Sequence, residues 1–265
     1  GYERHADKRY KAKAYCGPKG YHGQRYHRGE RLDAVYLRPV YRVDYRRYHL
    51  APPPRGYAVA LAALGVLGVG AVYFSALAWL RRGERTSLLL ALVCLAASGQ
   101  LGAEVARGFV NYPYPLHVWR VGAIAGFAAL FAVLLTAFAA ARFPQRRGGI
   151  AVAAAALVCA ALLVLMPGFD GKAVACLVTG SGLGALLAWR GWRARQAGAA
   201  PALAGMAVFP LLALLSGNVF LDQTFYIALI GLALLLFAAQ AAALWREERD
   251  REDAKLRAAE LELRL

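Results

Sequence analysis

The sequence predicts an all-α integral membrane protein: a seven-transmembrane helix bundle between a basic N-terminal segment and a charged, coiled-coil-like C-terminal helix. Of the 265 residues, 59% are hydrophobic, above the roughly 45–50% usual in soluble domains. Residues 57–245 hold only 16 charged residues, gathered in short clusters between long uncharged runs. These runs predict that the chain lies in a lipid bilayer, which is its first expected partner. They argue against a soluble enzyme.

A helix needs about 20 apolar residues to cross ~30 Å of hydrocarbon, and seven uncharged runs come close to this length. They cover residues 57–80, 87–106, 118–141, 149–166, 173–189, 199–217 and 224–245. Residues 166–171, Met-Pro-Gly-Phe-Asp-Gly, predict a tight turn between the fourth and fifth spans, because Pro and Gly end helices. Pro210 lies inside the sixth span, where neighbouring helices can satisfy the freed carbonyl.

Basic residues in the connections predict the orientation, because short loops rich in Lys and Arg stay in the cytoplasm. The first, third and fifth connections hold nine arginines, against Arg107, Arg120 and Lys172 in the other three. We expect a multi-pass protein of the bacterial inner membrane, with a cytoplasmic C-terminus and a periplasmic N-terminus. A six-span chain with its N-terminus inside is the competing topology. Tryptophans near the predicted span ends suit the headgroup level: Trp79, Trp119, Trp189, Trp192 and Trp245.

Residues 1–56 form a separate basic segment with a net charge of +9. Residues 1–57 hold ten of the 14 tyrosines and four of the five histidines but few aliphatic residues, which predicts either a small sheet or disorder. The chain begins at Gly1 without an initiator methionine, consistent with a removed signal peptide. Cys16, His22 and His27 are candidate ligands for a divalent transition metal. The alternative is a solvated basic segment without a metal. Such a segment could bind lipid headgroups or envelope polysaccharide, whereas a periplasmic location argues against nucleic acid.

The end of this segment resembles a known periplasmic family. Residues 26–32, Tyr-His-Arg-Gly-Glu-Arg-Leu, and residues 41–57, which end in Pro-Pro-Pro-Arg-Gly-Tyr, are similar to the RcnB-type family of small periplasmic proteins. The resemblance implies a periplasmic address and a link to nickel and cobalt homeostasis.

Ionisable groups at membrane depth are rare and mark function, and Glu104 is the only carboxylate inside a predicted span. One interpretation is an interfacial glutamate paired with Arg107 at i,i+3. The other is an outward-facing ligand pocket made of Glu104, Arg107, His117, Arg120, Asp170 and Asp222. No lysine lies in the last span to hold retinal, and no Walker A, HExxH or paired-cysteine motif occurs. We therefore predict no enzyme and no cofactor in the bundle, with Cys94, Cys159 and Cys176 packed as small hydrophobes.

The last span runs into a charged segment, residues 246–265, without a Gly or Pro after Gly231. Opposite charges recur at helical spacing in Glu247–Arg251, Arg249–Asp253 and Glu260–Arg264. Ala254, Ala258, Leu261 and Leu265 are spaced 4, 3 and 4, as in the seam of a coiled coil. This pattern predicts either a homodimer through 246–265 or a solvated helix end.

Residues 57–265 resemble the bacterial seven-transmembrane receptors with diverse intracellular signalling modules. The likeness rests on the order of seven spans, Glu104, the last span and the charged helix after it. It implies a sensor that passes an external signal to a cytoplasmic module or partner. The alternatives are a non-catalytic accessory subunit of a larger membrane complex and a metal-homeostasis membrane protein.

Overall fold

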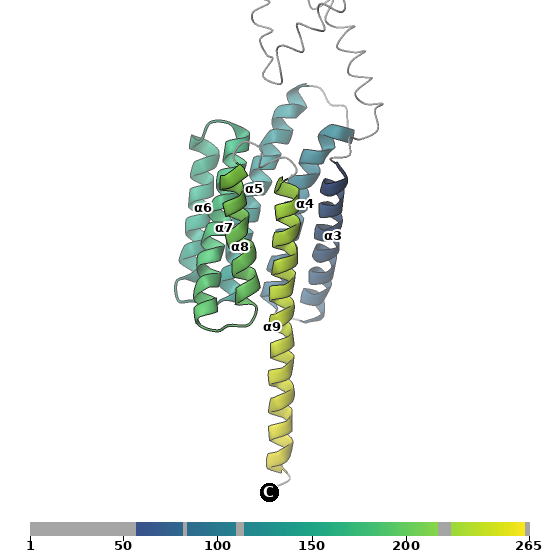
Figure 1. Ribbon diagram of the computed structural model, residues 1–265, viewed down its shortest axis with the longest axis vertical. Coiled ribbons are helices and arrows are strands. Elements are labelled where there is room, and N and C mark those ends of the chain that lie inside the picture. The colour runs from purple at the N-terminus through teal and green to yellow at the C-terminus, as the bar shows by residue number, and fades with distance from the viewer. Residues whose placement is uncertain (1–56, 82–83, 110–113, 217–223, 263–265) are drawn as a thin grey trace, which may run out of the picture. The chain divides into compact units, whose positions relative to one another are not determined.

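Seven helices make up the described part of the chain (Figure 1). The computed structural model describes residues 57–81, 84–109, 114–216 and 224–262, all within Pro53–Leu265, the second of two units into which the chain divides. Within these residues every regular element is a helix. The helices are α3 (Tyr57–Leu80), α4 (Arg85–Phe109), α5 (Tyr114–Arg142), α6 (Gly148–Leu165), α7 (Phe169–Arg193), α8 (Ala199–Ser216) and α9 (Phe225–Glu262).

The helices have the lengths and compositions of membrane spans. Six of those described are long and apolar enough to cross a bilayer, and α8 contributes a shorter apolar stretch, Ala199–Leu215. An all-helical, membrane-type architecture is therefore confirmed, whereas a seventh crossing stays a prediction. Pro210 lies within an unbroken α8, as expected. The turn after α6 is shorter than predicted, because Gly168 takes up the positive φ of +77° and the next helix begins at Phe169.

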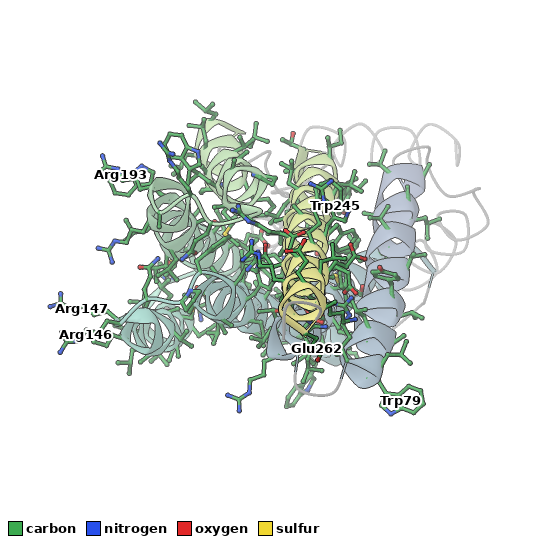
Figure 2. The ribbon with its side chains drawn as sticks, turned by 90° about the horizontal axis from the view of Figure 1, so that it is seen from below. Trp79, Arg146, Arg147, Arg193, Trp245 and Glu262 are labelled. Carbon is green, nitrogen blue, oxygen red and sulfur yellow. The ribbon has the colours of Figure 1, made fainter. Side chains whose placement is uncertain are left out.

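Consecutive helices run up and down, and six of them close a ring. In order around the ring, α3, α4, α5, α7, α8 and α9 each pack on the next, and α9 packs on α3. Helix α6 lies outside the ring, against α5 and α7 (Figure 2). The arginine-rich connections α3–α4, α5–α6 and α7–α8 all lie at the end where α9 leaves the bundle, and Arg146, Arg147 and Arg193 point outward there.

Small residues let the central helices approach closely, as is common where helices pack inside membranes. A Cβ placed on Gly180 of α7 would lie 2.4 Å from the Cα and 2.6 Å from the carbonyl oxygen of Ala132 on α5. The Thr136 hydroxyl donates to the Gly180 carbonyl at 3.3 Å across the same contact. One turn later, Gly184 faces Met206 of α8 at 2.8 Å from its Cβ position. A Gly-x-x-x-Gly pair thus joins α7 to both neighbours.

Helix α9 continues well past the bundle (Figure 1). It has 38 residues, or about 57 Å at 1.5 Å per residue. Of the expected charge pairs, Glu247–Arg251 forms at 2.6 Å, whereas the Arg249 guanidinium stacks 3.8 Å from the centre of the Trp245 ring. Ala254 and Ala258 are exposed. The Leu261 side chain and Leu265 lie outside the described residues, so the coiled-coil seam stays a prediction.

Candidate functional site

The structure brings together part of the ligand pocket expected from the sequence. Glu104 lies near the end of α4, and His117 and Arg120 lie in the first two turns of the adjacent α5. The Arg120 Nη1 donates to the carbonyl oxygens of Ala103 at 3.2 Å and Glu104 at 3.3 Å. Arg120 therefore ties the two helix ends together through the backbone of α4.

Of the other predicted site residues, Asp170 is the one whose side chain the structure describes. Asp170 is exposed in the first turn of α7, which packs on α5, α6 and α8. The Arg107 side chain, Asp222 and the predicted metal ligands Cys16, His22 and His27 lie outside what the structure describes. Cys94, Cys159 and Cys176 are buried, as expected of small hydrophobes.

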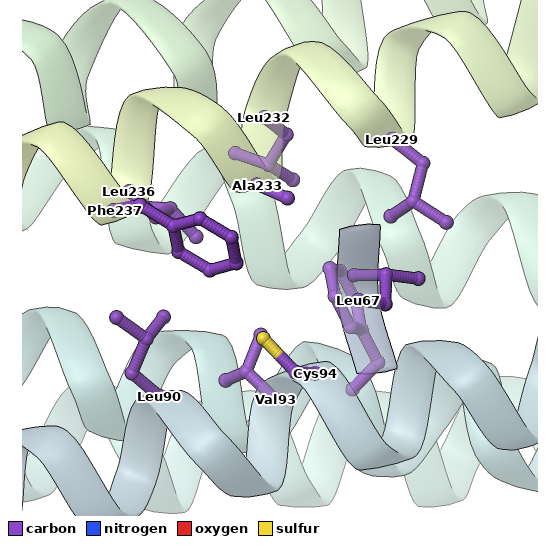
Figure 3. A pocket seen from close by; sticks show the side chains of 10 residues that line it. Leu67, Leu90, Val93, Cys94, Leu229, Leu232, Ala233, Leu236 and Phe237 are labelled. Carbon is purple, nitrogen blue, oxygen red and sulfur yellow. The ribbon is translucent and has the colours of Figure 1, made fainter. Parts of the chain in front are cut away.

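A cavity lies inside the ring, between α3, α4, α5 and α9 (Figure 3). Its volume is about 10 Å³, and apolar side chains such as Leu67, Leu90, Phe131 and Leu232 line it together with Cys94. This is space for about one water molecule, far below the roughly 300–1,000 Å³ of small-molecule sites. The cavity is thus a packing defect between α4 and α9 and not a ligand pocket.

A polar network lies where α9 leaves the bundle, and we call it the α9 exit cluster. Its members come from the α3–α4 connection, the start of α4 and the middle of α9: Arg81, Glu84, Thr86, Ser87, Gln240 and Glu248. Gln240 and Ser87 are buried, with exposed fractions of 1% and 0%. An amide among apolar helices is costly unless it is hydrogen-bonded, so these contacts hold α9 in position.

The Gln240 amide is the centre of the cluster. Its Nε2 donates to Glu84 Oε1 at 2.8 Å and lies 3.2 Å from Ser87 Oγ and 3.3 Å from Thr86 Oγ1. Because an amide nitrogen carries only two hydrogens, these three acceptors share two donors. The bond to the Glu84 carboxyl oxygen is the shortest of the three, and hydrogen bonds to carboxylates are stronger than those between neutral groups.

A salt bridge extends the cluster beyond the bundle. Arg81 Nη2 lies 3.3 Å from Glu248 Oε2, with both side chains partly exposed. Within the described residues, three buried atoms of the cluster have no hydrogen-bond partner: Arg81 Nη1, Glu84 Oε2 and Gln240 Oε1. The cluster is therefore only partly satisfied in this arrangement, which is unusual for buried polar atoms.

The α7–α8 turn presses on α9 beside the cluster. Arg142 Nη2 donates to the Ala197 carbonyl at 2.7 Å, and Glu84 and Glu247 lie close enough to act electrostatically on Arg142. Gly198 has a φ of +76°, and a Cβ there would lie 2.1 Å from the Ala239 carbonyl oxygen. The α7–α8 connection therefore meets α9 at Ala239, and the α3–α4 connection meets it at the next residue, Gln240.

The sequence analysis did not identify this cluster, although the sequence carries a signal for it. Gln240 is the only amide or charged side chain between Phe225 and Trp245. Glu84 is the only acidic residue in a connection that otherwise carries arginines. Neither fact says that the two meet, since they are 156 positions apart.

No protein-family model, curated protein or solved structure matches the chain.

Proposed function

We propose that this chain is a membrane sensor and transducer, in which α9 passes a signal from the bundle to a module or partner at its exit side. The observation that carries the proposal is the single unbroken α9, which lines the bundle, engages the α9 exit cluster and then projects beyond it. A rigid helix transmits translation or rotation over its whole length. The likeness to bacterial seven-transmembrane receptors implies the same role.

The proposal includes seven crossings. Helix α8 has 18 residues, about 27 Å at 1.5 Å per residue, which is close to the ~30 Å hydrocarbon thickness. It runs beside α7 and α9 (Figure 1). With seven crossings the two termini lie on opposite sides, and the arginine-rich connections favour a cytoplasmic location for the α9 exit.

The energies of the α9 exit cluster suit a switch. A partly exposed pair such as Arg81–Glu248 contributes at most about 1 kcal/mol. A hydrogen bond to a charged group, such as Gln240–Glu84, contributes about 1.5–3 kcal/mol. Together they match the 1–3 kcal/mol typical of coupling between distant sites. An external ligand that moves α3 or α4 by a small step can therefore strengthen or weaken the contacts that fix α9 in the α9 exit cluster.

The direction of one face of α9 below the bundle indicates which kind of partner can pack on it. Ala254 and Ala258 follow Leu236 and Gln240 by 18 residues, which is five full turns at 3.6 residues per turn. Since Leu236 and Gln240 are buried against the bundle, this face points beneath it. A parallel α9 from a second copy would have to occupy the bundle above. We therefore propose that a helix of the cytoplasmic module or partner packs on this face, and that a homodimer uses another face.

Insertions after Trp245 test the transducer role. A reporter kinase would be fused after Glu262, with one, two, three or seven residues inserted between Trp245 and Arg246. Seven residues restore the helical phase to within about 20°, so we expect kinase output to change with the short insertions and to return with seven. Output that is unaffected, or that declines steadily with length, would contradict the proposal and favour an accessory subunit.

A further inference from the structure

A second feature lies on the outside of the bundle: an apolar groove between α3 and α9. Its volume is about 340 Å³, within the range of small-molecule sites. Its walls include Val69, Gly70 and Tyr73 on α3 and Ala238, Ala241 and Leu244 on α9. Val69, Tyr73, Ala238 and Ala241 are exposed, so the groove opens away from the bundle.

The groove lies beside a contact between aromatic side chains of α3 and α9. The rings of Phe74 and Phe237 pack at 5.1 Å between centroids. The Phe237 ring occupies the space that a Cβ on Gly70 would need, 2.2 Å from Cζ. Beyond this contact, Ala238 and Ala241 leave the α9 wall without large side chains.

We propose that this groove is a binding site for an anionic phospholipid, with one acyl chain in the groove and the phosphate at the α9 exit end. A helix with its side chains is about 10 Å across, too wide to enter between two helices that touch at Phe74 and Phe237. A linear hydrocarbon chain fits an apolar groove that opens to the bilayer. Burial of each methylene contributes roughly 0.8 kcal/mol relative to water.

The charge at the end of the groove selects the headgroup. Leu244 is followed by Trp245, which is 63% exposed, and Arg249 stacks on that ring. Arg85 and Arg246 are also exposed at this end. Tryptophan and arginine at a span end suit the headgroup level, and basic residues beside transmembrane helices bind anionic headgroups. Glu247 and Glu248 are also exposed at this end, but they pair with Arg251 and Arg81. The arginines at positions 85, 246 and 249 therefore favour phosphatidylglycerol over phosphatidylcholine.

The test measures lipid binding to the full chain in non-ionic detergent. Native mass spectrometry would count retained phosphatidylglycerol or phosphatidylcholine, and thermal unfolding would give the shift in Tm on adding each lipid. The groove variant is Ala241→Phe, which fills the site, and its control is Ala156→Phe at an exposed alanine of α6. The headgroup variant is Arg249→Gln, and its control is Arg257→Gln, about two turns further from the bundle.

We expect phosphatidylglycerol to bind and to raise Tm in the wild type and in both controls. Ala241→Phe should abolish the increment, and Arg249→Gln should weaken binding about fivefold, the contribution of one basic residue near a membrane surface. An increment that survives Ala241→Phe would overturn the groove assignment. Equal binding of the two lipids would overturn the headgroup assignment. A dimer that Ala241→Phe dissociates would assign the groove to a second copy and overturn the proposal.

Discussion

The contact between α5 and α7 at Gly180 gives the sharpest prediction for the fold. Substitution Gly180→Ala adds a Cβ at 2.4, 2.5 and 2.6 Å from the Cα, Cβ and carbonyl oxygen of Ala132. Ordinary contacts begin near 3.4 Å, and two of these three atoms belong to the backbone. The two helices must therefore separate by about 1 Å, which also lengthens the Thr136–Gly180 hydrogen bond. Overpacking of this kind costs about 1–3 kcal/mol.

The control is Gly182→Ala, two residues along the same helix, where nothing lies within 4 Å of the added Cβ. It isolates helix propensity, and replacing a helical glycine by alanine gains about 0.5–1 kcal/mol. Because the gain in helix propensity is the same in both variants, we expect them to differ by the overpacking cost, roughly 1–3 kcal/mol, with Gly180→Ala the less stable. The free energy of unfolding would be measured by denaturant titration in detergent micelles, followed by tryptophan fluorescence.

A double variant strengthens the test. Ala132→Gly removes the Cβ contact at 2.5 Å but leaves the Cα and the carbonyl oxygen in place. The double variant Ala132→Gly/Gly180→Ala should therefore stay destabilised. If Gly180→Ala proved as stable as Gly182→Ala, the close approach of α5 and α7 would be refuted.

Three further predictions concern the sites. Gln240→Leu removes the 2.8 Å donor to Glu84 and should destabilise the chain by about 1–3 kcal/mol; a double-mutant cycle with Glu84→Gln should show non-additivity, and simple additivity would count against the contact. Glu104→Gln should leave expression and stability intact but blunt any response to ligand in the reporter fusion, so an unchanged response would end the outer-pocket hypothesis. Ala254→Cys should cross-link to a partner helix in membranes, while Leu256→Cys should not; the reverse pattern would place the partner on the other face.

Much of the helical architecture can be predicted from the lengths of the uncharged runs in the sequence. The predicted runs at 57–80 and 149–166 correspond closely to α3, Tyr57–Leu80, and α6, Gly148–Leu165. The ends of α4, α5 and α7 extend beyond the predicted runs by up to four residues. They differ because charged residues such as Arg85 and Arg142 lie in the terminal turns, where long side chains can reach water while the backbone stays helical.

The outer pocket stays a prediction, although two of its residues lie at neighbouring helix ends. Local sequence places Glu104 at the end of one span and Arg120 at the start of the next, so a short connection brings them together. Asp170 also lies near a span end, at the start of α7, and its neighbours depend on how α7 packs on α5, α6 and α8. The order of helices around the ring depends on how small residues such as Gly180 fit against their neighbours. The lengths of the spans carry no information about this fit.

The sequence alone determined that the chain is a bundle of apolar helices, with its arginines in alternate connections and a helix that continues into a charged segment. These properties are local, since hydrocarbon tolerates few charges and an unbroken run without Gly or Pro stays helical. Only the tertiary structure decided that Gln240 meets Glu84, that α3 and α9 leave an apolar groove, and that Ala254 faces beneath the bundle. Each of these depends on which helices are neighbours and on their rotation, and both are set by side-chain packing between distant parts of the chain.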